Sequence, residues 1–145
     1  MELQTRKPNR LKDYDYSQNG AYFITICTKD RKPILSVIEN VDECVGETCG
    51  LPSVCLTDVG KTIKNEIGKT PLIYDNVFID NYVVMPNHIH LIIRINNNGR
   101  AQLSPTINRI IQQFKGSITK QFGESVWQKS FHDHIIRDDI DYQNI

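Results

Sequence analysis

The 145-residue chain lacks any run approaching the roughly eighteen apolar residues that a membrane-spanning helix needs. Its first ten residues, MELQTRKPNR, also lack the apolar centre of a secretion signal. These two absences exclude the membrane-spanning and secreted classes as first hypotheses and predict a cytoplasmic protein. The length suffices for one domain with a hydrophobic core, which we expect to occupy residues 1–145.

Paired cysteines are also missing from the sequence. There are four cysteines, and no two of them form a CxxC motif or have a histidine close by. A structural zinc site normally needs such spacing, and disulfides are uncommon in cytoplasmic proteins. We therefore expect free thiols at Cys27, Cys44, Cys49 and Cys55.

Net charge is zero, with 17 basic and 17 acidic residues, so the composition gives no global signal for nucleic-acid binding. The distribution is uneven, however, because acidic residues gather around positions 39–47 and 133–141. Basic residues occupy the start of the chain and the stretch between these clusters. Such a local basic surface can contact phosphates, although a merely solvated face fits the charge pattern equally well. The candidate DNA-contacting residues are Arg6, Lys7, Arg10, Arg94, Arg109, Lys115 and Lys120.

Hydrophobic periodicity predicts an α+β fold. A helix is expected from Thr57 or Asp58 to Gly68, and a second from Ser104-Pro105 to Gly123. Residues 33–52 show no clear period and suggest a hairpin or loop insertion. Strands are predicted at 21–28, 76–84 and 88–95, with an extended piece at 126–137 and a last acidic helix after it. The order predicts an antiparallel sheet with helices packed on it.

The strand at 88–95, HIHLIIRI, carries a histidine pair. Side chains two apart share one face of a strand, so His88 and His90 should lie together with Arg94. The alternate residues are all apolar and should face the core. Two neutral imidazoles at this spacing can bind one metal ion, although a surface pair without a ligand is an equally good interpretation of the pattern alone. A second pair, His132 and His134, lies among acids and is more typical of surface or supporting histidines.

Several segments resemble one transposase family. The stretch YVVMPNHIH at 82–90 resembles the HUH motif (histidine, hydrophobic, histidine) of single-tyrosine transposases. DYSQNGAYFITICT at 15–28, FK at 114–115, VWQ at 126–128 and HIIRD at 134–138 extend the resemblance, in order, to the REP-associated tyrosine transposases.

This resemblance implies a ferredoxin-like or RRM-like sheet with helices on one face and the HUH pair on a central strand. It further implies Mg²⁺ or Mn²⁺ bound by His88 and His90, and metal-assisted cleavage and rejoining of single-stranded or hairpin DNA through a 5′-phosphotyrosine. On this resemblance we expect a cytoplasmic, nucleoid-associated protein without a membrane partner. Whether this chain acts as a monomer or a homodimer is left open.

The family's attacking tyrosine belongs to a C-terminal helix beyond the arginine-aspartate segment. Two hypotheses compete: that Tyr142 is the nucleophile, or that the chain stops at Ile145 before the part that carries it. Register against the family favours the second. Two other functions remain as alternatives, namely a non-catalytic DNA-hairpin-binding module on the same fold and a metal hydrolase that uses both histidine pairs.

Overall fold

The computed structural model describes residues 11–39, 53–97 and 105–145. Its centre is a four-stranded antiparallel sheet with the order β4-β5-β1-β6. The strands are β1 (Gly20–Cys27), β4 (Val77–Val84), β5 (His88–Ile95) and β6 (His132–Ile136). With the helix after β1 and the helix after β5, this order is that of a ferredoxin-like fold. The predicted fold class is confirmed, and the HUH strand β5 is internal to the sheet.

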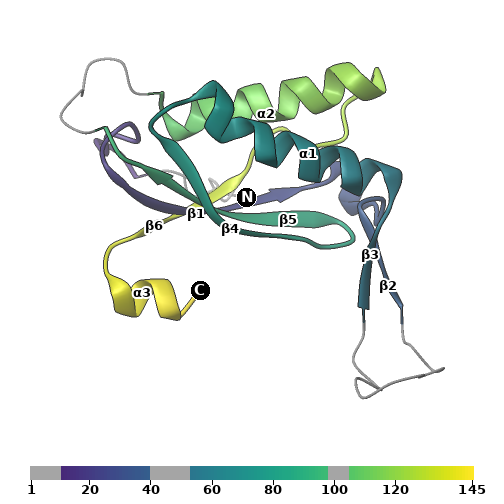
Figure 1. Ribbon diagram of the computed structural model, residues 1–145, viewed down its shortest axis with the longest axis horizontal. Helices are drawn as coiled ribbons and strands as arrows, with labels where there is room; N and C mark the ends of the chain where they lie inside the picture. The colour runs from purple at the N-terminus through teal and green to yellow at the C-terminus, as the bar shows by residue number, and fades with distance from the viewer. Residues whose placement is uncertain (1–10, 40–52, 98–104) are drawn as a thin grey trace, which may run out of the picture.

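Two helices form a layer on one face of the sheet, as Figure 1 shows. They are α1 (Asp58–Ile73) and α2 (Ile107–Phe122), and both begin at a threonine whose hydroxyl accepts a backbone N–H of the first turn. A short helix, α3 (Asp139–Gln143), lies on the other side of the sheet. The sheet therefore has one face covered by two helices and a second, more open face.

The helix boundaries differ from the prediction at two points. Helix α1 does not end at Gly68 but continues to Ile73. Its residues Ile67 and Thr70, on either side of Gly68, are buried, and their packing outweighs the weak helix propensity of glycine. Helix α2 starts at Ile107 with Thr106 as its cap, so Pro105 precedes the helix; Ser104 lies outside the described residues. Gly123 ends α2 in the left-handed conformation, as predicted.

The core lies between the sheet and the helix layer. Ile89, Leu91, Ile93 and Ile95 of β5 are all at most 3% exposed, which confirms the apolar alternate face of that strand. Opposite them, α2 supplies the residues at helical spacing: Ile107, Ile110, Ile111, Phe114 and Ile118. Trp127 is also buried and lies beside Phe114, with ring centroids 6.0 Å apart. The hydrophobic pattern thus fixes which face of β5 is left for the histidines.

A two-stranded hairpin projects from the body where the sequence suggested an insertion (Figure 1). It consists of β2 (Ser36–Glu39) and β3 (Ser53–Leu56). Cys27 and Cys55 are free thiols, whereas Cys44 and Cys49 lie outside the described residues. In the part of the chain that the structure describes, no helix is both long and apolar enough to cross a bilayer.

Candidate functional site

The open face of the sheet collects all four histidines. In antiparallel pairs, directly opposed residues point to the same side, and β1 lies between the two histidine-bearing strands. Thr25 of β1 is opposed by His90 on one side and by His132 on the other. One step away along β1, Cys27 opposes His88, and Phe23 opposes His134. The two HxH motifs therefore share one surface, a relationship that their separation in the sequence concealed.

The HUH pair is compact. The imidazole centroids of His88 and His90 lie 4.7 Å apart, with the ring planes at 75°. Both rings are partly exposed, so they neither point apart nor disappear into the core. The second ring is also stacked on Phe23, with centroids 5.0 Å apart and planes 20° from parallel. This arrangement follows from a regular strand whose other face is fixed by burial.

Each of these imidazoles is held through the same nitrogen. Nδ1 of His88 lies 2.7 Å from the Asn87 side-chain oxygen, and Nδ1 of His90 lies 2.9 Å from the Thr25 hydroxyl. An amide oxygen only accepts, so the His88 Nδ1 carries the proton and its Nε2 presents a lone pair. Among the described residues, neither Nε2 atom has a hydrogen-bond partner. Metal-binding histidines are commonly oriented in this way, by a hydrogen bond to the nitrogen that does not face the metal.

The surroundings favour the neutral form of both rings. Burial lowers the pKa of His88 below its usual 6.5, and the positive charge of Arg31 lowers it further. Burial also lowers the pKa of His90, with a smaller contribution from its neighbour His88. Only the neutral imidazole binds a cation, so these shifts extend the pH range in which the pair can act as a ligand.

Arg31 is a site residue that the sequence reasoning missed. It ends the short turn Lys29–Arg31 after β1, where Asp30 and Arg31 both have positive φ values of 55° and 53°. The buried Thr28 fastens this turn to the HUH strand, because its hydroxyl lies 3.0 Å from the Asn87 carbonyl and 2.9 Å from that of Lys32. The Arg31 guanidinium is exposed and has no ion-pair partner among the described residues. The pairing of β1 with β5 brings the end of β1, and the turn after it, to His88. This pairing cannot be read from the sequence alone.

Arg94 shares the open face, as predicted, but its charge is already paired. Its Nε lies 3.0 Å from a carboxylate oxygen of Asp80, and its guanidinium lies 4.8 Å above the Phe78 ring. The Asp80 hydrogen bond raises the pKa of Arg94. Arg94 is also six positions along β5 from His88, at the far end of the strand. Any phosphate contact by this residue would compete with Asp80.

The other predicted DNA-contacting residues are not brought to the histidines. Arg109, Lys115 and Lys120 belong to α2, in the helix layer over the opposite face of the sheet. Lys115 is engaged structurally, because its Nζ donates to the carbonyls of Gln128 and Ser130 at 2.7 and 3.0 Å. Arg6, Lys7 and Arg10 lie outside the described residues. Their roles in DNA binding stay predictions.

The second histidine pair does not complete a metal site with the first. Among residues 11–39, 53–97 and 105–145, no group of three or more histidine, cysteine, aspartate or glutamate side chains is placed to hold a metal. His134 instead contacts Asp141 of α3 at 2.8 Å. Tyr142, the candidate nucleophile, follows Asp141 on this helix and is 41% exposed. Its hydroxyl has no hydrogen-bond partner in the described part of the chain.

Comparison with known proteins shows that the chain is similar to transposases. An uncharacterised Haemophilus influenzae protein is 32% identical over 99% of this chain and 85% of its own length. A second H. influenzae protein, provisionally named a REP-associated tyrosine transposase, is 25% identical over 90% of this chain and 68% of its own length. A solved REP-associated tyrosine transposase, bound to a REP hairpin, superposes with a TM-score of 0.64. The chain belongs to the same family as the first H. influenzae protein, and it is similar to REP-associated tyrosine transposases in sequence and in fold.

Solved structures support this likeness at the level of the fold. The hairpin-bound transposase is 20% identical, and the match covers 93% of this chain and 66% of the other, just under two thirds of that length. A provisionally assigned transposase from Deinococcus radiodurans R1 is 14% identical with a TM-score of 0.54, covering 93% and 92% of the two chains. No family model matches the sequence. The predicted resemblance to REP-associated tyrosine transposases is confirmed.

Proposed function

We propose that this protein nicks and rejoins single-stranded or hairpin DNA through a 5′-phosphotyrosine intermediate. The observation that carries the proposal is the HUH pair, with two imidazoles 4.7 Å apart on the open face and both Nε2 atoms uncommitted among the described residues. The hairpin-bound relative supports a hairpin substrate. Arg31 supplies a positive charge close enough to His88 to lower its pKa, and such a guanidinium is available to pair with a DNA phosphate.

The residues present fit a divalent cation in part. His88 and His90 would hold Mg²⁺ or Mn²⁺ through their Nε2 atoms, and oxygen ligands would have to complete the coordination. A bound divalent ion polarises a scissile phosphate as a Lewis acid. Asn87 and Thr25 would keep the imidazoles oriented, since each holds the Nδ1 atom on the far side of its ring.

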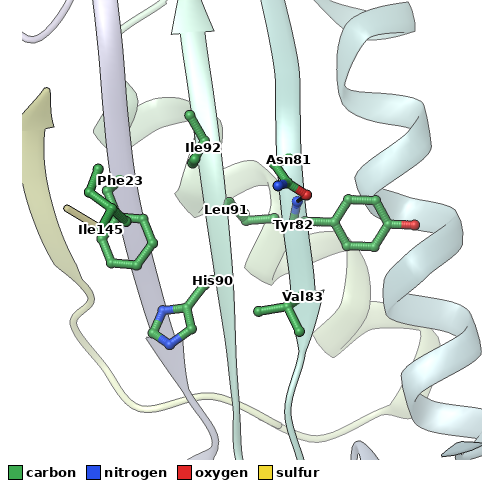
Figure 2. Close-up of a pocket in the computed structure, with 8 residues that line it drawn as sticks. All are labelled: Phe23, Asn81, Tyr82, Val83, His90, Leu91, Ile92 and Ile145. Carbon is green, nitrogen blue, oxygen red and sulfur yellow. Dashed lines mark hydrogen bonds between the residues drawn. The ribbon is translucent and has the colours of Figure 1, made fainter. Parts of the chain in front are cut away.

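The proposed cleavage step exchanges one phosphoester for another. A tyrosine oxygen attacks the phosphorus in line, loses its proton, and forms the 5′-phosphotyrosine while the bond to the 3′ oxygen breaks and a 3′-OH leaves. The bond energy is kept, so the reverse attack rejoins strands. Tyr142 is the candidate in this chain, because the residues after α3 approach the site: Ile145 lines the same cleft as His90 (Figure 2).

A non-catalytic hairpin-binding protein is the second candidate function. It is favoured by the position of Tyr142, which belongs to a helix held by His134 and makes no hydrogen bond to His88 or His90. In this alternative the open face binds DNA, but the protein does not form a covalent bond to it.

A covalent-adduct assay separates the two candidates. The chain is incubated with DNA hairpins that carry single-stranded flanks of random sequence, in Mn²⁺ or Mg²⁺, and resolved on a denaturing gel. Catalysis predicts a protein–DNA adduct that His88→Ala abolishes and His132→Ala, on the same face but in the second pair, retains. Loss of the adduct in Tyr142→Phe would assign the nucleophile. Tight hairpin binding without any adduct would contradict catalysis and support the non-catalytic hairpin-binding function.

A further inference from the structure

A cleft opens beside the HUH pair on the helix-free face of the sheet. It has a volume of about 360 Å³ and lies across β1, β5 and β4. Figure 2 shows its lining, with Phe23 and His90 on one side, Ile92 at the centre and Val83 and Asn81 on the other. Ile145, which follows α3, lies over Phe23 in this view. The cleft thus shares a residue, His90, with the site already described.

A bulge in β4 determines which side chains face this cleft. The register between β4 and β5 shifts between Ile79 and Asn81, so Asp80 is the extra residue. After the shift, Asn81 is opposed by Ile92, and Val83 by His90, which puts both on the histidine face. The side chain of Tyr82 accordingly points away from His90, toward a separate cavity next to α1, although the residue still borders the cleft. Without the bulge, Tyr82 rather than Val83 would oppose His90.

The chemistry of the lining is largely apolar, with one aromatic platform and one oriented amide. Phe23 is half-buried and already stacks on the His90 imidazole. The Asn81 oxygen accepts the backbone N–H of Tyr82 at 2.8 Å, so its amide nitrogen keeps both hydrogens for another partner. Among the described residues, that nitrogen has none. A flat apolar surface beside a hydrogen-bond donor is the combination that receives an unpaired base.

We propose that this cleft binds one unpaired nucleobase of the DNA strand, stacked on Phe23, with the Asn81 amide donating to an acceptor on the base edge. The proposal rests on the proposed function, since it assumes that DNA lies on the open face. The volume accommodates one base with its sugar, and the shared His90 puts the nucleotide's backbone next to the HUH pair. Bases that present an acceptor toward Asn81 are preferred over those that present only donors.

The test measures hairpin affinity by fluorescence anisotropy. The probe is the tightest-binding labelled hairpin from a pool with random single-stranded flanks, followed by a series in which each flank nucleotide in turn is made abasic. One abasic position should weaken binding by about tenfold, the usual scale for a lost base–aromatic stack. Phe23→Ala should lose the same factor on the intact probe and lose nothing more on that abasic probe. Asn81→Ala should relax the base preference at this position.

Two control variants keep the result interpretable. Phe122→Ala removes an exposed phenylalanine from the end of α2, outside the cleft, and should bind like the wild type. Phe23→Leu keeps apolar volume but lacks the aromatic face, so it should fold with an unchanged Tm and still bind weakly. If the hairpin binds but abasic probes and Phe23→Ala leave its affinity unchanged, the cleft holds only the chain's own residues and the proposal fails. If no hairpin binds the wild type, the proposed function itself fails.

Discussion

His134 of β6 and Asp141 of α3 are joined by a contact of 2.8 Å between the imidazole Nε2 and a carboxylate oxygen. The other carboxylate oxygen accepts the Arg137 backbone N–H at 3.0 Å, and the Asp141 N–H itself donates to the capping carboxylate of Asp138. One carboxylate therefore fastens the C-terminal helix to the edge strand of the sheet. A histidine of the second HxH motif thus helps to hold the helix that carries Tyr142.

Asp141→Asn should loosen α3 without unfolding the sheet. The His134 hydrogen bond, with a smaller contribution from Arg137, lowers the pKa of Asp141 below its ordinary 3.8. Because the folded pKa is depressed, the contact is present above the ordinary value and is lost as pH falls through the lowered one. We expect faster amide hydrogen exchange in residues 139–145 of the variant at neutral pH, and an almost unchanged Tm, since exposed pairs contribute little. Exchange as slow as in the wild type would show that other contacts hold α3.

The HUH histidines should make the metal-free protein sensitive to mild acid. Their folded pKa values lie below the ordinary 6.5, so the unfolded chain binds protons first as the pH falls. The free energy of unfolding should therefore decrease on the acid side of pH 6.5 and level off below the lowered values. Urea unfolding on either side of this pH measures the effect, and His90→Gln should reduce it. A wild-type stability that is flat across this range would contradict the lowered pKa values.

Arg31→Ala should weaken DNA binding more than Arg109→Ala. Arg31 is an exposed cation close enough to His88 for its charge to lower the pKa of that histidine, whereas Arg109 is an exposed arginine of α2 on the helix side. Loss of one phosphate contact should lower affinity for all sequences alike and reduce the salt-dependence slope by about one. Anisotropy titrations at several salt concentrations measure both. An equal loss of affinity in the two variants would contradict the placement of DNA on the open face alone.

The sequence sufficed for the strands and their faces because burial imposes a strict alternation on HIHLIIRI, and the apolar set had to meet the core. It did not suffice for partners across strands. The pairing of Arg94 with Asp80, the approach of Arg31 to His88 and the shared face of the two HxH motifs all depend on register and on the β4 bulge. Gly68 misled for a different reason, since helix packing beyond it outweighed its local preference.

Glu66 offers a test of the helix layer. It is 6% exposed and lies between α1 and α2, where its oxygens contact Lys69 at 2.6 Å, Ser117 at 2.8 Å and Gln121 at 2.9 Å. The Lys69 contact contributes most to lowering its pKa. Glu66→Ala should reduce the free energy of unfolding by about 1–3 kcal/mol, because Ser117 and Gln121 of α2 lose their hydrogen-bond acceptor. Chemical denaturation checks this against Glu124→Ala, an exposed matched control; equal stabilities would show that solvent replaces these contacts without cost.

Two glycines of α1 should respond oppositely to the same substitution. A Cβ at Gly60 would lie 2.0 Å from the backbone oxygen of Leu35, a contact that neither atom can relieve by a side-chain rotation. Leu35 is fully buried, and its carbonyl also accepts the Thr57 N–H, so its backbone cannot withdraw without breaking the connection between α1 and the β2 segment. Gly60→Ala should therefore destabilise the protein strongly. A Cβ at Gly68 meets nothing within 4 Å, so Gly68→Ala should stabilise α1 by about 0.5–1 kcal/mol. Thermal unfolding of the two variants measures both signs, and a Gly60→Ala protein as stable as the wild type would show that α1 and Leu35 are not packed this closely.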